Sequence, residues 1–141
     1  MSKRHKVQWL VDLLKGVEGH IDEKKFAELL EERGRACIGA SYIQKAKDAA
    51  KGAKDTEEFL DNFEKVYPML HREGDKVYVV YPECYCPGMK GFKGEVPYSY
   101  CYCSVGWVKE MFEQALKRPI EVELEASVLR GDDACRLRVL L

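Results

Sequence analysis

The chain has 141 residues, the size of one ordinary domain, and 46% of them are hydrophobic while 33% are charged. This balance is typical of a globular protein and excludes a disordered or membrane-spanning chain, since no apolar run approaches the ~20 residues that a span needs. Basic and acidic residues, 23 and 24 in number, are spread along the sequence, which argues against nucleic acid as a partner. Six cysteines without a recognisable signal peptide indicate a cytoplasmic protein with reduced or metal-bound thiols.

Helical signals fill the first 68 residues. Four apolar residues of the first segment recur at helical spacing, namely Val7, Leu10, Val11 and Leu14. We expect Gly16 and Gly19 to end this helix. Asp22 then provides an N-terminal cap for a second helix, which Gly34 is expected to stop.

Two more helices complete this helical part. One continues to about Lys51. The other begins at Asp55, which forms a capping box with Glu58, and is halted by Pro68.

The remaining part, residues 69–141, changes to the two-residue period of strands. Residues 69–72 and 76–81 predict a β-hairpin around a Glu-Gly-Asp turn. A helix is expected from about Val105 to Lys117, closed by Pro119. We therefore predict one α+β domain over residues 1–141, with N-terminal helices packed on an antiparallel sheet of about four strands, arranged as two hairpins with one helix between them.

The last hairpin shows the clearest alternation. Apolar residues alternate with glutamates over residues 120–128, and with arginines over residues 135–141. A tight turn centred on Gly131-Asp132 would set Ala126 opposite Leu137 and Val128 opposite Cys135. The same register sets Glu125 opposite Arg138 on the outer face.

Four cysteines form two C-x-C pairs, Cys84 with Cys86 and Cys101 with Cys103. In extended backbone, residues two apart point the same way, so each pair would present two sulfurs on one face. Four thiolates are a common structural site for zinc, although the usual spacing is C-x-x-C. Two alternatives stay open, because cysteine is often a small buried apolar residue and C-x-C thiols can be redox-active.

Six residues are candidates for contact with a small, often hydrophobic ligand. They combine aromatic rings, which suit a concave site, with cysteines predicted to reach the interior: Cys37, Tyr85, Tyr100, Tyr102, Trp107 and Cys135. No histidine motif or nucleophile elbow indicates a known hydrolytic mechanism.

Residues 103–141 carry a helix with an early glycine, an Arg-Pro-Ile step into an alternating strand, and then Gly-Asp-Asp-Ala-Cys before an Arg-Leu-Arg strand. This tail resembles the 4-vinyl reductase domain and related proteins called L-2-amino-thiazoline-4-carboxylic acid hydrolase-like. Four residues match the pattern of that family: Gly106, Pro119, Gly131 and Cys135.

The resemblance implies an α+β fold, a homodimer and binding of small hydrophobic molecules. In some members, a glutamate and cysteines of this tail bind zinc. Here Ser127 and Leu124 stand at two of those positions, so any zinc ion would have to use the C-x-C cysteines, with or without Cys135. The leading prediction is a small-molecule-binding domain with a structural zinc ion, and the alternatives are a hydrolase of a small cyclic amide-like or thiazoline substrate and a thiol-redox protein.

Overall fold

The computed structural model of the protein describes residues 2–83, 89, 91–92 and 94–141. Four helices come first, with the bounds α1 Lys3–Glu18, α2 Glu23–Cys37, α3 Ala40–Ala50 and α4 Thr56–Glu64. The Asp22 carboxylate accepts hydrogen bonds from two free amides at the start of α2, and that of Asp55 accepts one at the start of α4. Both predicted caps are confirmed.

Of the two glycines predicted to end α1, Gly19 is its C-cap, whereas Gly16 lies inside the helix. Two other predicted helix ends are wrong. Gly34 lies inside α2 and is buried there. Helix α4 ends at Glu64, before Pro68 is reached.

Four strands form one antiparallel sheet in the order β1-β2-β4-β3, with the bounds β1 Leu70–Glu73, β2 Lys76–Tyr81, β3 Glu121–Ala126 and β4 Cys135–Leu140. Between the hairpins lie a short 3-10 helix, η1 (Tyr98–Cys101), and helix α5 (Tyr102–Leu116). Gly74 has φ +63°, the left-handed conformation that a two-residue hairpin turn requires. The predicted α+β class, with two hairpins and one helix between them, is confirmed.

The predicted register of the last hairpin is wrong by two residues. Leu124, not Ala126, pairs with Leu137, and Glu123 pairs with Arg138. The connection is longer than a tight turn, because residues 128–130 form a second 3-10 helix and a register shift follows Leu124. A shift of two residues leaves each side chain on its predicted face, so apolar residues still face the core.

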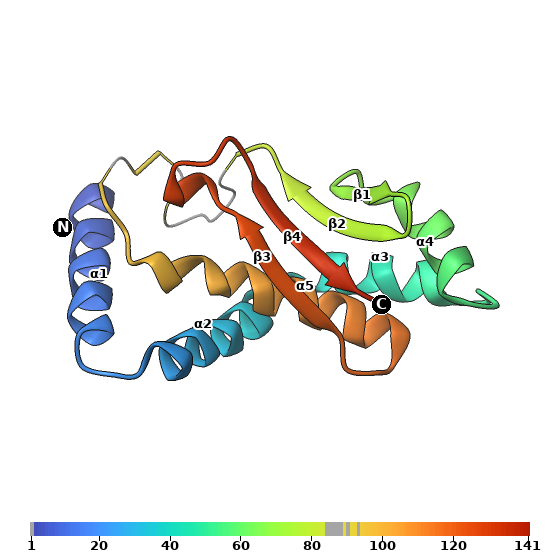
Figure 1. Ribbon diagram of the computed structural model, residues 1–141, viewed down its shortest axis with the longest axis horizontal. Coiled ribbons are helices and arrows are strands. Elements are labelled where there is room, and N and C mark those ends of the chain that lie inside the picture. Colours follow the sequence, from blue (N-terminus) through green and yellow to red (C-terminus); the bar gives the residue numbers. More distant parts are fainter. Residues whose placement is uncertain (1, 84–88, 90, 93) are drawn as a thin grey trace.

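Helices α3 and α5 lie on one face of the sheet, across the strands (Figure 1). One apolar core joins α3, α4 and α5 to the inner sides of the strands. Its fully enclosed members include Ala46, Phe59, Phe63, Val79, Val108, Phe112 and Leu137. Helix α1 stands at one end of the molecule, next to the start of α2 (Figure 1). No helix among the described residues combines the length and the apolar character that crossing a membrane requires.

Candidate functional site

A cavity of about 680 Å³ lies where the helices meet one end of the sheet. It is bordered by the end of α2, by α3, by the segment between α4 and β1, by the ends of β2 and β4, and by η1 and the start of α5. Residues from distant parts of the chain therefore share its wall. Most of this wall is apolar, and the charged side chains that the described part of the chain contributes to it are Lys45 and Glu83.

Four aromatic side chains in this wall form a closed circuit, which we call the aromatic ring. The ring of Tyr42 lies 6.3 Å from that of Tyr67 and 5.0 Å from that of Trp107, measured between centroids. Trp107 lies 6.2 Å from Tyr81. The Tyr81 and Tyr67 hydroxyl oxygens, 2.9 Å apart, close the circuit. The three ring contacts are edge-to-face, with interplanar angles of 62° to 81°, a geometry that stabilises aromatic pairs by about 0.5 to 1.5 kcal/mol each.

The two phenols that are hydrogen-bonded to each other, those of Tyr67 and Tyr81, stay protonated at neutral pH. Burial raises the pKa of Tyr67 well above its ordinary value, although the hydrogen bond between Tyr67 and Tyr81 acts in the opposite direction. Burial also raises the pKa of Tyr81. Both groups therefore act as neutral hydrogen-bonding groups in the cavity wall and contribute no negative charge.

The four described cysteines all border the cavity. Cys37 is exposed at the end of α2 and Cys103 is half-buried, whereas Cys101 and Cys135 are buried. The sulfur of Cys101 lies 2.7 Å from the hydroxyl oxygen of Ser127. The sulfur of Cys135 accepts a hydrogen bond from the backbone amide of Val128, the residue after Ser127, at 3.4 Å.

The expected extended backbone at the second C-x-C pair is wrong. Cys101 ends η1 and Cys103 lies in the first turn of α5. Residues two apart on a helix are rotated by roughly 200°, so these side chains diverge and their sulfurs cannot share one tetrahedral ion. Among the described residues, no three histidine, cysteine or acidic side chains are placed to hold a metal ion together. The predicted four-sulfur site therefore does not fit this backbone. Cys84 and Cys86 lie outside the described residues.

The start of α5, which carries part of the cavity wall, is held against α2 by two glycines. A β-carbon added to Gly34 would lie 1.8 Å from the carbonyl oxygen of Cys103, and one added to Gly106 would lie 1.9 Å from that of Glu31. Each glycine thus accommodates the backbone of the opposite helix. This close approach explains why Gly34 lies within a helix.

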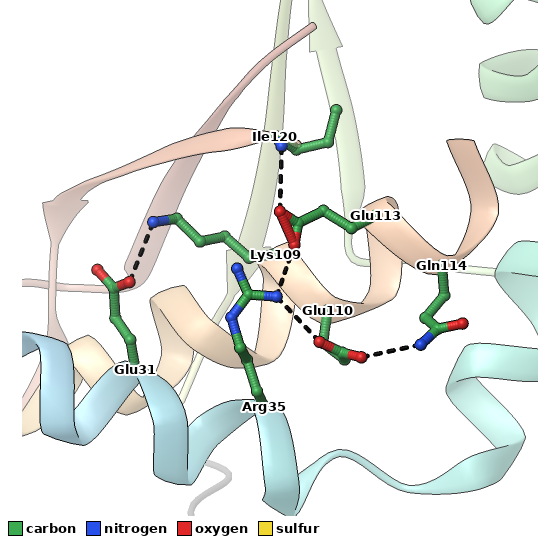
Figure 2. A network of polar contacts seen from close by, with 7 residues as sticks. All are labelled: Glu31, Arg35, Lys109, Glu110, Glu113, Gln114 and Ile120. Atoms are coloured by element: carbon green, nitrogen blue, oxygen red, sulfur yellow. Dashed lines mark hydrogen bonds and ion pairs between the residues drawn. The ribbon is translucent and has the colours of Figure 1, made fainter. Parts of the chain in front are cut away.

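Charged side chains link the same two helices further along (Figure 2). The Arg35 guanidinium on α2 donates to the carboxylates of Glu110 at 2.9 Å and Glu113 at 2.6 Å on α5. Burial alone would raise the pKa of Glu113, but hydrogen bonds from Arg35 and from the amide of Ile120 outweigh it and lower that pKa. Lys109 pairs with Glu31 at 3.0 Å. The wall formed by α5 is therefore fixed by packing and by charge.

The structure brings together four of the six predicted ligand-contacting residues, since Cys37, Tyr100, Trp107 and Cys135 border the cavity. Tyr102 lies elsewhere: it packs against the core, with the Arg130 guanidinium 5.6 Å from its ring centroid. Tyr85 lies outside the described residues.

Among the aromatic residues of the cavity, sequence analysis missed the two that come from the helical part, Tyr42 and Tyr67. Tyr67 follows the apolar stripe of α4, which indicates burial but not a cavity. Tyr42 is 39% exposed, and no local pattern marks it. Only the tertiary fold places these rings beside Trp107.

Fold and cavity together define a small α+β domain with a wall of aromatic rings and thiols. The chain belongs to DUF6144, a family of unknown function, whose family model matches residues 1–141. No curated protein matches the chain. The resemblance of residues 103–141 to the 4-vinyl reductase domain stays a prediction.

Proposed function

We propose that this protein binds a small, largely apolar molecule in the cavity between its helices and the end of its sheet. The observation that carries the proposal is the cavity itself, whose volume of about 680 Å³ falls within the range of about 300 to 1,000 Å³ found for small-molecule sites. Apolar and aromatic lining with few charged groups is also typical of such sites. The resemblance of the tail to 4-vinyl reductase domains points in the same direction.

A fluorescence titration tests this proposal. The neutral apolar dye N-phenyl-1-naphthylamine brightens when it leaves water, so we expect a saturable increase with about one dye per chain. Val66 borders the cavity and is 46% exposed, whereas Leu29 lies on α2 away from it and is 45% exposed. Val66→Phe narrows the cavity and is expected to weaken dye binding, while the matched control Leu29→Phe leaves it unchanged. Equal affinity in both variants would contradict the proposal.

A zinc ion is a separate proposal. Helical geometry allows such an ion to take only one of Cys101 and Cys103 beside Cys84 and Cys86. Elemental mass spectrometry of untagged protein purified without added metal measures the zinc content. If zinc is bound as proposed, either Cys101→Ser or Cys103→Ser removes it, and the other variant retains it. A protein without zinc, or loss from both variants, would contradict the proposal.

A further inference from the structure

Helix α1 carries apolar side chains on two opposite sides. One side packs against the rest of the protein, since Val11 is fully buried and Val7 and Leu14, one turn away in either direction, are half-buried. Trp9 and Leu13 are each two residues from Val11, a rotation of roughly 200°, and therefore point away from that packed side. A helix on the surface of a globular protein needs only one apolar side, so the intramolecular packing of α1 does not account for the second.

The outward side of α1 is open to solvent. Trp9 is 60% exposed and Leu13 47%, and Leu10, which follows Trp9 along the helix, is 37% exposed. We call these three residues the α1 stripe. Helix α1 stands at one end of the molecule (Figure 1), so a partner reaches the stripe without displacing the sheet. Grouped exposed apolar residues mark interaction surfaces, whereas singly scattered ones do not.

The charges at the start of α1 oppose its own dipole. Its first turn contains basic residues, Lys3, Arg4 and Lys6, and no acidic one. The free amides of a helix give its N-terminus a partial positive charge, so cations in the first turn are unfavourable there. The C-terminal end of a helix carries the opposite partial charge. These cations are therefore better placed beside the C-terminal end of a second helix.

An antiparallel copy of α1 satisfies both the apolar stripe and these charges. With a two-fold axis between Leu10 and Leu13, Leu10 of each copy faces Leu13 of the other. Lys6 lies four residues before Leu10, and Val17 lies four residues after Leu13. The same arrangement therefore sets Lys6 of each copy beside Val17 in the last turn of the other helix.

We propose that α1 is a dimerisation surface, on which a second copy of this chain packs its own α1 in antiparallel orientation over Trp9, Leu10 and Leu13. This inference does not depend on the ligand-binding function proposed above. Helix α1 has 16 residues and is therefore about 24 Å long. One such helix pair buries less than the roughly 800 Å² per partner of a standard interface, so we expect a weak dimer with a Kd on the order of 10 to 100 μM.

A lipid surface fits the stripe less well than a second copy does. Helices that lie on anionic membranes carry lysine and arginine on their polar face and gain from attraction to the lipid headgroups. In α1, the Asp12 carboxylate lies next to the stripe, three residues after Trp9, and the Gln8 amide donates a hydrogen bond to it at 3.0 Å. An acidic group in this position is repelled by such a membrane.

Sedimentation velocity under reducing conditions tests the proposal, because a reductant excludes dimers linked through the exposed thiol of Cys37. Over concentrations from about 1 to 500 μM, we expect the sedimentation coefficient to rise from that of a monomer toward that of a dimer. Leu13→Glu places a charge in the stripe and is expected to weaken association at least about ten-fold. Leu29 on α2 is 45% exposed and outside the stripe, so Leu29→Glu is a matched control that is expected to associate like wild type.

Replacement of Lys6 separates association from folding. Lys6→Glu puts an acidic group at the N-terminus of α1, which favours the helix within one chain, and beside the C-terminal end of the other α1, which disfavours the dimer. We therefore expect this variant to resist urea at least as well as wild type at concentrations where both are monomeric. Its association should be weaker by about two- to five-fold.

Four outcomes would overturn the proposed dimer. They are a wild-type protein that stays monomeric over the whole range, equal association of Leu13→Glu and Leu29→Glu, association of Lys6→Glu as tight as wild type, and a monomeric chain that sediments with vesicles of phosphatidylcholine and phosphatidylserine unless it carries Leu13→Glu. The last outcome would assign the stripe to a membrane surface. Circular dichroism checks that each variant is folded, since Leu13 and Lys6 are exposed in the single chain.

Discussion

Replacement of Gly34 by alanine places a methyl group where α2 and α5 are in backbone contact. The new β-carbon would lie 1.8 Å from the Cys103 carbonyl oxygen and 3.0 Å from the amide nitrogen of Trp107. Both are backbone atoms of one helix, so no side-chain rotation can relieve the clash. The helices must therefore separate locally.

The size of the effect follows from that separation. Carbon and oxygen atoms need more than 3 Å, so α5 must move by roughly 1.5 Å, and gaps of that order forfeit much of the dispersion energy across the contact. Overpacking of this kind costs about 1 to 3 kcal/mol, and more where backbone must move. The intrinsic helix preference for alanine over glycine returns about 1 kcal/mol. Since both clashing atoms belong to the backbone, we expect a cost at the upper end of that range, and therefore a net loss of about 2 kcal/mol in the free energy of unfolding.

Urea unfolding followed by circular dichroism measures this loss. Gly16 lies inside α1, where an added β-carbon would meet no atom within 4 Å, so Gly16→Ala is a matched control that is expected to stabilise the protein slightly. Because Cys103 and Trp107 border the cavity, Gly34→Ala is also expected to weaken dye binding by the folded protein. A Gly34→Ala variant as stable as wild type would refute the close packing of α2 on α5.

Three further predictions concern the pH dependence, the charged contacts and the sheet. Burial holds the pKa of Tyr67 above the value of about 10 of an unfolded tyrosine, so the folded state retains a proton that the unfolded state loses. Tyr67 should therefore lower the free energy of unfolding above pH 10 by up to about 1.4 kcal/mol per pH unit, in addition to the contribution of Tyr81. Urea titrations should show a shallower fall for Tyr67→Phe than for the wild type, and equal slopes would be the contrary result. Arg35→Met should lower the free energy of unfolding in urea by about 1 to 2 kcal/mol, because its carboxylate partners are only about a quarter exposed. Arg72→Met, whose carboxylate partners are 49% to 74% exposed, should lower it by less than about 1 kcal/mol. The reverse order would count against the α2–α5 network. Leu137 is fully buried and Arg138 half-buried, so circular dichroism should find Leu137→Asp unfolded and Arg138→Ala folded, and similar stability of the two would contradict the observed faces.

Signals confined to a few neighbouring residues predicted the structure well. Asp22 and Asp55 cap helices because their carboxylates reach amides two or three residues away. The first hairpin follows from strand-forming residues around a turn whose glycine supplies the left-handed conformation. In these cases the interacting groups are close in sequence.

The errors arise where a distant partner decides the conformation. A glycine that ends a helix and one that admits another helix look alike in sequence, and only α5 distinguishes them at Gly34. Alternating tyrosines and cysteines up to Cys103 resemble a strand, yet the apolar stripe of α5 extends the helix back to Tyr102. The register of the last hairpin depends on a 3-10 turn held by the Asp132 carboxylate, which accepts from the amide of Ser127. The site was only partly predictable for the same reason, because Tyr42 and Tyr67 reach Trp107 through the tertiary fold alone.

The position of β4 between β2 and β3 has a consequence for how the protein folds. Val77 pairs with Val139, so roughly 60 residues of chain must be closed into a loop before the middle of the sheet exists. A two-stranded hairpin is at best marginally stable alone, which leaves β1 and β2 without lasting protection until β4 arrives. We therefore expect amide hydrogens of β2 and β4 to become protected from exchange together and late, and the cavity wall at Tyr81 and Cys135 to form in that same step.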